Sequence, residues 1–191
     1  MDGCGSLVGL IVLSPLLLTI AVAVIVTNGR PVFFRQVRVG RHGRDFLLWK
    51  FRSMSVLPGA EAGRFDAGSS LRVTPVGRML RRAKLDELPQ LWNVLRGEMS
   101  LVGPRPEVRK WVEAYPDEWA RVLTGLPGIT DPASVEFRNE EELLARAAEP
   151  DRVYRCEILP RKLAIYEDYL KTQSTLGDVR ILWATLWALF R

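Results

Sequence analysis

The feature that most constrains this chain is an apolar run over residues 7–26, in which none of the 20 residues is charged. As a helix the run would be roughly 30 Å long, which is about the thickness of the hydrocarbon core of a bilayer. Neither a basic segment before the run nor a small-residue cleavage pattern after it is present, so a cleaved signal peptide is disfavoured. We therefore predict a membrane segment.

Ser14 and Pro15 interrupt the run near its middle. Proline removes a backbone donor and clashes with the preceding turn, and the serine hydroxyl can compete for the freed carbonyls. A sharp bend would leave arms of about 12 and 17 Å, too short to cross a bilayer, so the segment would enter and return on one side. Because proline kinks also occur in spanning helices, the residues alone leave a single span and a re-entrant segment open.

The segment that follows the apolar run is basic. Residues 30–52 contain seven Lys and Arg residues and one acidic residue, and the whole chain carries a formal net charge of +5. Basic sequence beside a membrane segment belongs on the cytoplasmic face, where anionic headgroups attract it. We therefore expect two regions, a membrane segment in residues 1–29 and a cytoplasmic catalytic domain in residues 30–191.

Residues 176–190 predict a C-terminal helix with apolar residues at helical spacing. Trp183 and Trp187 belong to this apolar set, and tryptophan on such a helix favours the headgroup boundary. Two interpretations stay open here, a helix in the membrane interface and an ordinary terminal helix packed on the protein.

Residues 31–54 predict a β-hairpin with its turn at residues 40–43. In the second strand, alternation places Lys50 and Arg52 on one face, opposite three apolar side chains. Two cations on one strand face are either solvated or a paired contact for phosphate. The opposite face holds Leu47, Trp49 and Phe51.

Residues 55–72 are small, polar and rich in glycine, and they predict a long loop. Thr74 and Pro75 then predict a helix start, with threonine as the N-cap and proline at the first position. This helix ends in a cationic stretch that includes Arg81.

Residues 84–96 predict a helix with one apolar side, and Pro89, which is tolerated only in a first turn, places its start near Asp86. Asp86 and Glu87 would then lie at a helix N-terminus. There the dipole and the free amides keep carboxylates ionised and leave donors for a phosphate. Acidic residues in a first turn often serve only as partners of the dipole, so their neighbours decide the interpretation.

Arg105 lies between two prolines, which restrict the backbone on both sides of its guanidinium group. A fixed arginine suits bidentate phosphate recognition better than a mobile lysine. Two carboxylates, a fixed arginine and further cations beside a membrane segment indicate a site that transfers phosphate at the bilayer surface.

The cysteine and histidine content makes a zinc site very unfavourable. Cys4 and Cys156 are far apart in the sequence, and the single histidine, His42, lies in a glycine-rich turn. The chemistry must therefore rest on carboxylates, Lys, Arg or hydroxyl groups. Any metal would be a hard, oxygen-binding ion such as Mg²⁺.

These motifs resemble the monotopic bacterial sugar transferases, which are polyprenyl-phosphate phosphoglycosyl transferases. The combination of residues 85–94 (LDELPQLWNV) with residues 102–106 (VGPRP) is very specific, unlike either piece alone. The matching stretches follow the order of the family and cover most of the chain: residues 13–16, 31–40, 50–54, 84–96, 100–106 and 127–130.

The resemblance implies an α+β fold, mostly helical, for a monotopic protein of the bacterial inner membrane. Its parts would be an N-terminal re-entrant helix-break-helix with the break at Ser14 and Pro15, a small β-hairpin, a catalytic helix and amphipathic interfacial helices. The catalytic domain would face the cytoplasm. Self-association as a homodimer stays open.

The resemblance also implies a two-step reaction between a UDP-sugar and polyprenyl (undecaprenyl) phosphate, which initiates cell-surface glycan biosynthesis. Asp86 would attack the phosphate attached to the sugar and release UMP, and polyprenyl phosphate would then attack the sugar phosphate on the aspartate. Glu87 would hold Mg²⁺, and Arg105 would contact phosphate. Substrate binding is assigned by position to Lys50, Arg52 and Arg81.

One stretch departs from the family pattern. After residues 127–130 many members continue with a Gly-Trp-Ala-Gln-Val-like sequence, whereas this chain has DPASVEFR at residues 131–138, so the contacts to sugar and nucleotide stay unassigned. A non-catalytic membrane-surface protein that binds anionic lipid would explain the basic flank but not the carboxylate pair. A nucleic-acid binder is disfavoured by the apolar run and by the lack of a basic helix or an aromatic-rich RNA motif.

Overall fold

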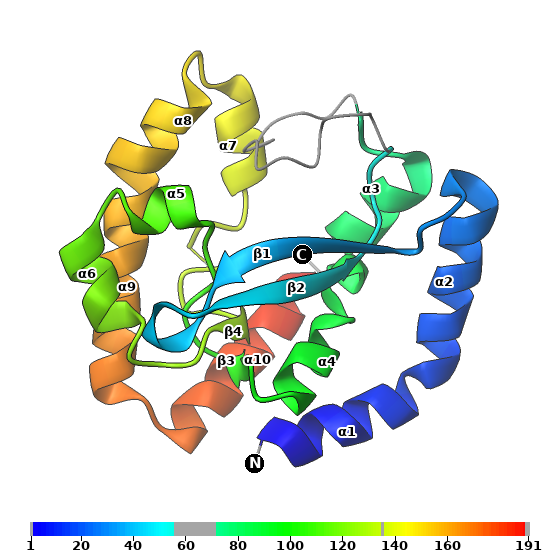
Figure 1. Cartoon of the computed structure of the whole chain (residues 1–191), viewed down its shortest axis with the longest axis horizontal. Helices are drawn as coiled ribbons and strands as arrows, with labels where there is room; N and C mark the ends of the chain where they lie inside the picture. The colour runs from blue at the N-terminus through cyan, green and yellow to red at the C-terminus, as the bar shows by residue number, and fades with distance from the viewer. Residues whose placement is uncertain (1, 56–71, 135, 190–191) are drawn as a thin grey trace.

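The computed structural model describes residues 2–55, 72–134 and 136–189. These residues form a mixed α+β fold that is mostly helical, with a two-stranded hairpin crossing the face shown in Figure 1. The predicted mostly helical α+β class with a small β-hairpin is thereby confirmed, whereas most of the predicted loop at residues 55–72 lies outside the described residues. The strands are β1 (Phe33–Val39), β2 (Asp45–Phe51), β3 (Ser100–Val102) and β4 (Gly128–Thr130). The helices and helical turns are α1 (Asp2–Val12), α2 (Ser14–Asn28), η1 (Arg41–Gly43), α3 (Pro75–Arg82), η3 (Leu85–Glu87), α4 (Gln90–Leu95), α5 (Arg109–Val112), α6 (Pro116–Val122), α7 (Glu140–Arg146), α8 (Pro150–Val153), η4 (Tyr154–Ile158), α9 (Leu159–Thr172) and α10 (Thr175–Leu189).

The N-terminal apolar run forms two helices, α1 and α2, that are bent by 63° relative to each other. The break lies where it was predicted, because Pro15 occupies the first turn of α2 and the Ser14 hydroxyl donates to the carbonyl of Ile11 at 2.7 Å. Within the described ranges no single helix has the length and apolar character needed to cross a membrane, although the bent pair together does. The predicted helix-break-helix is therefore present.

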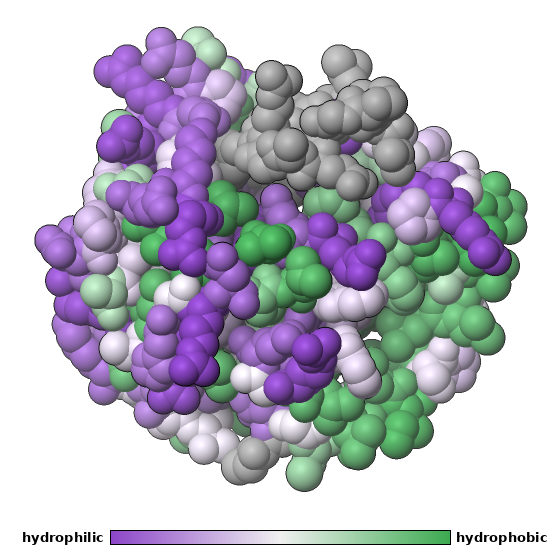
Figure 2. Space-filling model, viewed as in Figure 1, coloured by the Kyte–Doolittle hydropathy of each residue, from purple (hydrophilic) through white to green (hydrophobic). Residues whose placement is uncertain are grey.

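Apolar side chains gather over α1 and α2 on the outside of the protein (Figure 2). Val12 of α1 and Val26 of α2 are largely exposed. The opposite side of α2 is buried, since Val24 shares a hydrophobic cluster with Phe51 of β2 and Leu80 of α3. A large exposed apolar surface of this kind marks an interaction with a partner or a membrane.

The hairpin of β1 and β2 has the predicted alternation. In the middle of β2 the face that carries Lys50 packs inward, whereas at the end of β2 Phe51 of the other face is buried against α2 and α3. Leu48 on that face is buried, whereas Leu47 on the other face is exposed. The reason is Asn93 of α4, whose amide oxygen accepts from the Trp49 N–H at 3.1 Å while its NH₂ group donates to the Leu47 carbonyl at 2.7 Å. These bonds hold α4 against β2 and turn Lys50 toward the interior.

The second sheet pairs β3 with β4 in parallel, with Ser100 opposite Gly128 and Val102 opposite Thr130. The two segments approach closely, because a Cβ atom on Gly128 would lie 2.1 Å from the amide nitrogen of Gly103. Only glycine fits at such a position. Since the two strands are parallel, the residues that follow β3 and β4 leave the sheet at the same edge.

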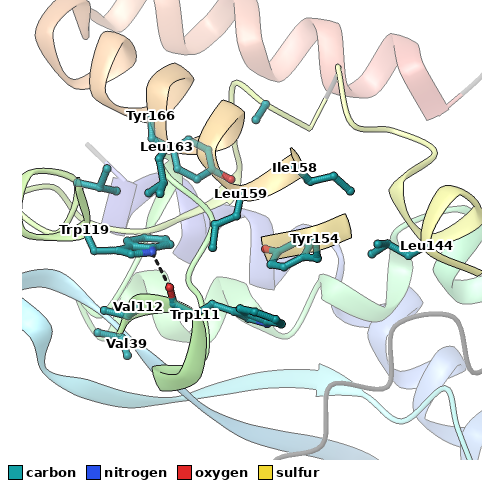
Figure 3. Packing of buried hydrophobic residues seen from close by; sticks show 12 residues of the cluster. Val39, Trp111, Val112, Trp119, Leu144, Tyr154, Ile158, Leu159, Leu163 and Tyr166 are labelled. Atoms are coloured by element: carbon teal, nitrogen blue, oxygen red, sulfur yellow. Dashed lines mark hydrogen bonds between the residues drawn. The ribbon is translucent and has the colours of Figure 1, made fainter. Parts of the chain in front are cut away.

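The main hydrophobic core lies among α5, α6 and α9 (Figure 3). Its centre contains Trp119, whose indole N–H donates to the carbonyl of Trp111 at 3.1 Å, and Tyr154, whose ring lies 5.1 Å from that of Trp111. Tyr166 of α9 belongs to the same core. This packing fixes α9 in the body of the protein.

The C-terminal helix, α10, packs on β3 and β4. Thr185 Oγ1 lies 2.6 Å from Thr130 Oγ1, whereas Trp183 and Trp187 are 68% and 63% exposed. An ordinary packed helix would bury its large apolar residues. The two tryptophans of α10 therefore form part of the exposed apolar surface of the protein.

Candidate active site

Two acidic residues lie in a tight turn between α3 and α4. Asp86 and Glu87 belong to the 3-10 turn η3 and are only 6% and 7% exposed, and α4 begins later than predicted, at Gln90. Pro89 explains the delay, because it has no N–H group to bond the carbonyl of Leu85 in an α-helical pattern. The turn is instead closed by a hydrogen bond of the 3-10 type, in which the Leu88 N–H donates to the Leu85 carbonyl three positions earlier.

Glu87 is the centre of a buried ion-pair network. Its carboxylate accepts hydrogen bonds from the Lys50 ammonium group at 2.7 Å and from two guanidinium nitrogens of Arg105 at 2.5 and 3.3 Å. Burial alone would raise the pKa of Glu87, but Arg105 and Lys50 outweigh burial and hold that pKa well below its usual range. For Lys50 burial has the opposite sign and lowers the pKa, whereas the negative charge of Glu87 acts to raise it. The structure thus brings three predicted site residues together and shows that Lys50 is not merely solvated.

Asp86 has a different environment, although it is the neighbour of Glu87. Its Oδ1 atom is buried and has no hydrogen-bond partner in the described part of the chain. Burial raises the pKa of Asp86, Lys50 opposes this rise and Glu87 adds to it, so burial acts against the ionisation that a helix terminus was expected to favour. Leaving a buried acceptor unpaired costs about 1–3 kcal/mol. The turn therefore keeps one carboxylate oxygen available to react or to bind a ligand.

Arg81 and Lys84 place further positive charge near Asp86. The helix α3 that carries Arg81 starts as predicted, because Thr74 Oγ1 accepts from the Gly77 N–H at 3.0 Å. Both cations act against the effect of burial on the pKa of Asp86, Lys84 more strongly than Arg81. Arg81 therefore lies close enough to Asp86 to act on its charge, and its assignment to substrate stays a prediction. The sequence analysis did not assign Lys84 to the site. Only its position two residues before Asp86 could have indicated that it lies near this carboxylate.

Arg52 was predicted to bind substrate, but the structure does not bring it to the carboxylates. Its buried guanidinium group donates to the backbone carbonyls of Asn28, of Gly29 at 2.6 Å and of Arg30 at 3.1 Å, all at the end of α2. Because β2 ends at Phe51, the alternation that would place Arg52 beside Lys50 no longer applies. We conclude that Arg52 fastens α2 to the hairpin.

The carboxylate pair suits the binding of a Mg²⁺ ion that arrives together with a substrate phosphate. Among the residues that the structure describes, no group of three or more His, Cys, Asp or Glu side chains could hold a metal ion. Mg²⁺, however, usually takes one or two carboxylates and completes its coordination with water and substrate phosphates. Asp86 offers an unpaired oxygen and Glu87 an ionised carboxylate that already contacts two cations. The donor set fits a metal that is shared with a substrate.

Sequence comparisons agree with this geometry. The family described as bacterial sugar transferase matches residues 1–191. The UDP-N-acetylgalactosamine-undecaprenyl-phosphate N-acetylgalactosaminephosphotransferase of Aeromonas hydrophila is 35% identical over 156 residues, which cover 73% of this chain and 37% of the relative. The UDP-glucose:undecaprenyl-phosphate glucose-1-phosphate transferase of Klebsiella pneumoniae is 41% identical over 145 residues, or 72% of this chain and 30% of the relative.

A third relative names another sugar. The undecaprenyl-phosphate galactose phosphotransferase of Salmonella typhimurium is 35% identical over 197 residues, which cover 94% of this chain and 37% of the relative. The chain therefore spans roughly a third of the length of these three relatives, from 30% to 37%. Their names share undecaprenyl phosphate and differ in the sugar.

Proposed function

Because the chain belongs to the bacterial sugar transferase family, we propose that it transfers a sugar phosphate from a UDP-sugar to undecaprenyl phosphate and releases UMP. The relatives described above carry these substrate classes in their names. The observation that carries the proposal for this chain is the turn itself. Asp86 has a buried oxygen that lacks a hydrogen-bond partner among the described residues, and its neighbour Glu87 contacts Lys50 and Arg105.

In the proposed first step, a carboxylate oxygen of Asp86 attacks the phosphorus atom that bears the sugar. A new P–O bond forms, the bond from this phosphorus to the bridging oxygen of the diphosphate breaks, and UMP leaves with the electron pair. In the second step, an oxygen of undecaprenyl phosphate attacks the same phosphorus, and Asp86 departs as a carboxylate. Covalent catalysis of this kind divides one difficult displacement into two easier ones.

The cations around the turn support the same displacement. The guanidinium group of Arg105 has five N–H donors, and two of its nitrogens contact Glu87, so further donors can bind phosphate oxygens. Lys50 and Arg81 add positive charge where the diphosphate would lie, which stabilises charge that develops on the transferring group. Mg²⁺ held by Glu87, with Asp86 beside it, would offset the charge of the diphosphate and of the leaving UMP.

The proposal also places the protein at the bacterial inner membrane, with residues 30–191 on the cytoplasmic side. The 63° bend between α1 and α2 supports a re-entrant segment, and the apolar side chains on both helices supply its lipid-facing surface. The exposed Trp183 and Trp187 of α10 would lie at headgroup level. Such an arrangement brings the carboxylates close to an acceptor that is itself a membrane lipid.

The test measures UMP release when the full chain, in detergent or a nanodisc, is mixed with each member of a UDP-sugar panel, undecaprenyl phosphate and Mg²⁺. Asp86→Asn should abolish UMP release. Asp45→Asn is the matched control, because Asp45 forms an exposed surface pair with Arg109 and should leave turnover unchanged.

The covalent step has a separate readout. Without the lipid acceptor, peptide mass spectrometry should locate a sugar phosphate on the peptide that contains Asp86. UMP release that depends on the acceptor, with no adduct under any condition, would refute the two-step route. Failure of every UDP-sugar to release UMP would instead favour a non-catalytic protein that binds anionic lipid.

A further inference from the structure

The face of the hairpin opposite Lys50, here called the outer face, is apolar although most of it is exposed. It consists of three cross-strand pairs, Phe33 with Phe51, Arg35 with Trp49, and Val37 with Leu47. Among these side chains, Phe33, Val37 and Leu47 are exposed. The solvated face of an antiparallel sheet is ordinarily polar. An exposed apolar face of this kind therefore indicates an interaction with a partner or a membrane.

Aromatic rings gather at the end of the outer face where β1 begins and β2 ends, beside the end of α2 (Figure 1). The ring of Phe33 stacks on that of Phe51 with a centroid distance of 5.4 Å, and it meets the ring of Trp49 edge-on at 5.6 Å. Phe51 also packs in the cluster that contains Val24 of α2. A continuous series of apolar contacts therefore runs from α2 to the exposed ring of Phe33.

Two exposed cations accompany these rings. Arg35 is exposed, and its guanidinium carbon lies 5.3 Å from the centroid of the Trp49 ring. A guanidinium group that stacks on an aromatic ring keeps N–H donors at its edge, where they can bind a phosphate group. Arg30, between α2 and β1, is exposed as well. This end of the hairpin thus combines apolar rings with positive charge.

The position of the rings relative to α2 determines which partner they suit. The helix ends at Asn28, and Val26, two residues earlier, is largely exposed. In a re-entrant segment, α2 would leave the hydrocarbon near this end. The residues that follow, up to Phe33 five positions later, would then lie at headgroup level. Aromatic rings and arginine side chains favour this level of the bilayer.

We propose that Phe33, Arg35 and Trp49 bind the anionic headgroup of a bilayer phospholipid, as a membrane contact separate from the two N-terminal helices. The inference rests on the membrane placement given under the proposed function. The guanidinium group of Arg35 would bind the lipid phosphate, and the two rings would lie against the upper part of the acyl chains. A second copy of the chain fits this end of the hairpin less well, because the exposed Arg30 and Arg35 of two copies would repel each other.

Quenching of Trp49 by brominated lipids tests the inference on the full chain in nanodiscs. The contribution of Trp49 is the difference in fluorescence between the wild type and Trp49→Phe. Quenching is followed as brominated phosphatidylglycerol or brominated phosphatidylcholine replaces unlabelled phosphatidylcholine, which gives the relative affinity of the site for the two lipids. We expect phosphatidylglycerol to be preferred about fivefold, the contribution of one arginine near an anionic surface. Arg35→Gln should reduce this preference to less than about twofold.

A matched pair of variants locates the contact along the hairpin. Phe33 and Val37 both belong to the outer face of β1 and are 40% and 53% exposed. They are separated by four residues, or about 13 Å, which exceeds the screening length of about 8 Å at physiological ionic strength. Phe33→Glu should therefore abolish the preference for phosphatidylglycerol, whereas Val37→Glu should change it by less than about twofold. This pair decides the question if Arg35→Gln does not fold.

Equal quenching of Trp49 by the two lipids would overturn the inference, and so would a preference that survives Arg35→Gln or Phe33→Glu. If Phe33→Glu removed chemical cross-links between copies and left lipid quenching unchanged, the outer face would be an interface between copies instead. A chain that does not enter nanodiscs would refute the membrane placement and the inference together. A chain that enters them and shows no lipid preference would refute the inference alone. Because the measurement contains no substrate, its outcome is independent of UMP release.

Discussion

Asp86→Asn and Glu87→Gln should change stability in opposite directions, although the two residues are neighbours in one turn. Asp86→Asn removes a buried charge whose Oδ1 atom has no partner among the described residues, so we expect a gain of about 1 kcal/mol in the free energy of unfolding. Glu87→Gln breaks buried ion pairs, which typically costs about 3–5 kcal/mol. The partners Lys50 and Arg105 keep 21% and 33% of their side-chain exposure, so solvent screening reduces the expected loss to about 2–3 kcal/mol.

These energies convert into measurable shifts of the unfolding midpoint. For a chain of this length 1 kcal/mol corresponds to about 2–4 °C, so Asp86→Asn should raise the Tm by about 2–4 °C and Glu87→Gln should lower it by about 4–12 °C. Thermal unfolding in a single detergent can follow the intrinsic fluorescence of the six tryptophans. Asp45→Asn, in an exposed pair, serves as the control with a near-zero shift.

The pH dependence of the two shifts provides the refuting result. Burial raises the folded-state pKa of Asp86, so ionisation of Asp86 destabilises the fold as pH rises through that pKa. The gain in Asp86→Asn should therefore be present at pH 8 and vanish near pH 4, around the ordinary pKa of aspartate. The pKa of Glu87 is depressed, so the loss in Glu87→Gln should be complete at neutral pH and shrink in acid. A lower Tm for Asp86→Asn at pH 8 would show that this carboxylate is not the uncompensated charge described above.

Three further predictions concern the N-terminal helices, α10 and Arg52. A cysteine added at the N-terminus should resist an impermeant reagent applied to intact cells, and replacing Ser14 and Pro15 by leucine should expose this cysteine to the reagent. Labelling of the added cysteine in the protein that keeps Ser14 and Pro15 would exclude a re-entrant segment. Lipid-borne quenchers placed near the headgroups should quench Trp183 and Trp187, whereas full quenching by aqueous iodide alone would contradict an interfacial α10. Arg52→Ala should lower the free energy of unfolding by about 2–4 kcal/mol, because three carbonyls lose their donors, without changing UDP affinity in the folded fraction; weaker UDP binding at an unchanged Tm would restore its assignment to substrate.

The parts of the fold that depend on local sequence were predictable. The break at Ser14 and Pro15 and the cap at Thr74 follow from backbone chemistry within one turn, and the structure contains both. The hairpin also follows from local alternation, since each strand shows its own period. Which face of β2 is buried depends on Asn93, a residue of a helix more than 40 positions away, and nothing in the strand itself indicates that choice.

The candidate site was predictable in its members and less so in its geometry. Spacing singled out Asp86 and Arg105, but the different pKa shifts of Asp86 and Glu87 depend on which carboxylate faces the cations in the folded turn. Arg52 contacts backbone carbonyls rather than the carboxylates because its strand ends one residue earlier than the alternation assumed. Asp131 received no role because it directly follows β4, which pairs with β3, and these two strands of three residues each are too short to show a period.

The attachment of Arg52 to the end of α2 has a practical consequence for anyone who wishes to prepare a water-soluble version of this protein. Removing residues 2–28 would delete the carbonyl of Asn28 that Arg52 contacts and would strip Val24 from the cluster around Phe51. The guanidinium group would lose one of its three backbone acceptors, at a cost of about 1–3 kcal/mol. Lys50 lies two residues earlier on the same chain, so a shortened protein would loosen the strand that presents this ammonium group to Glu87. Purification should therefore keep the N-terminal helices and supply detergent or lipid for them.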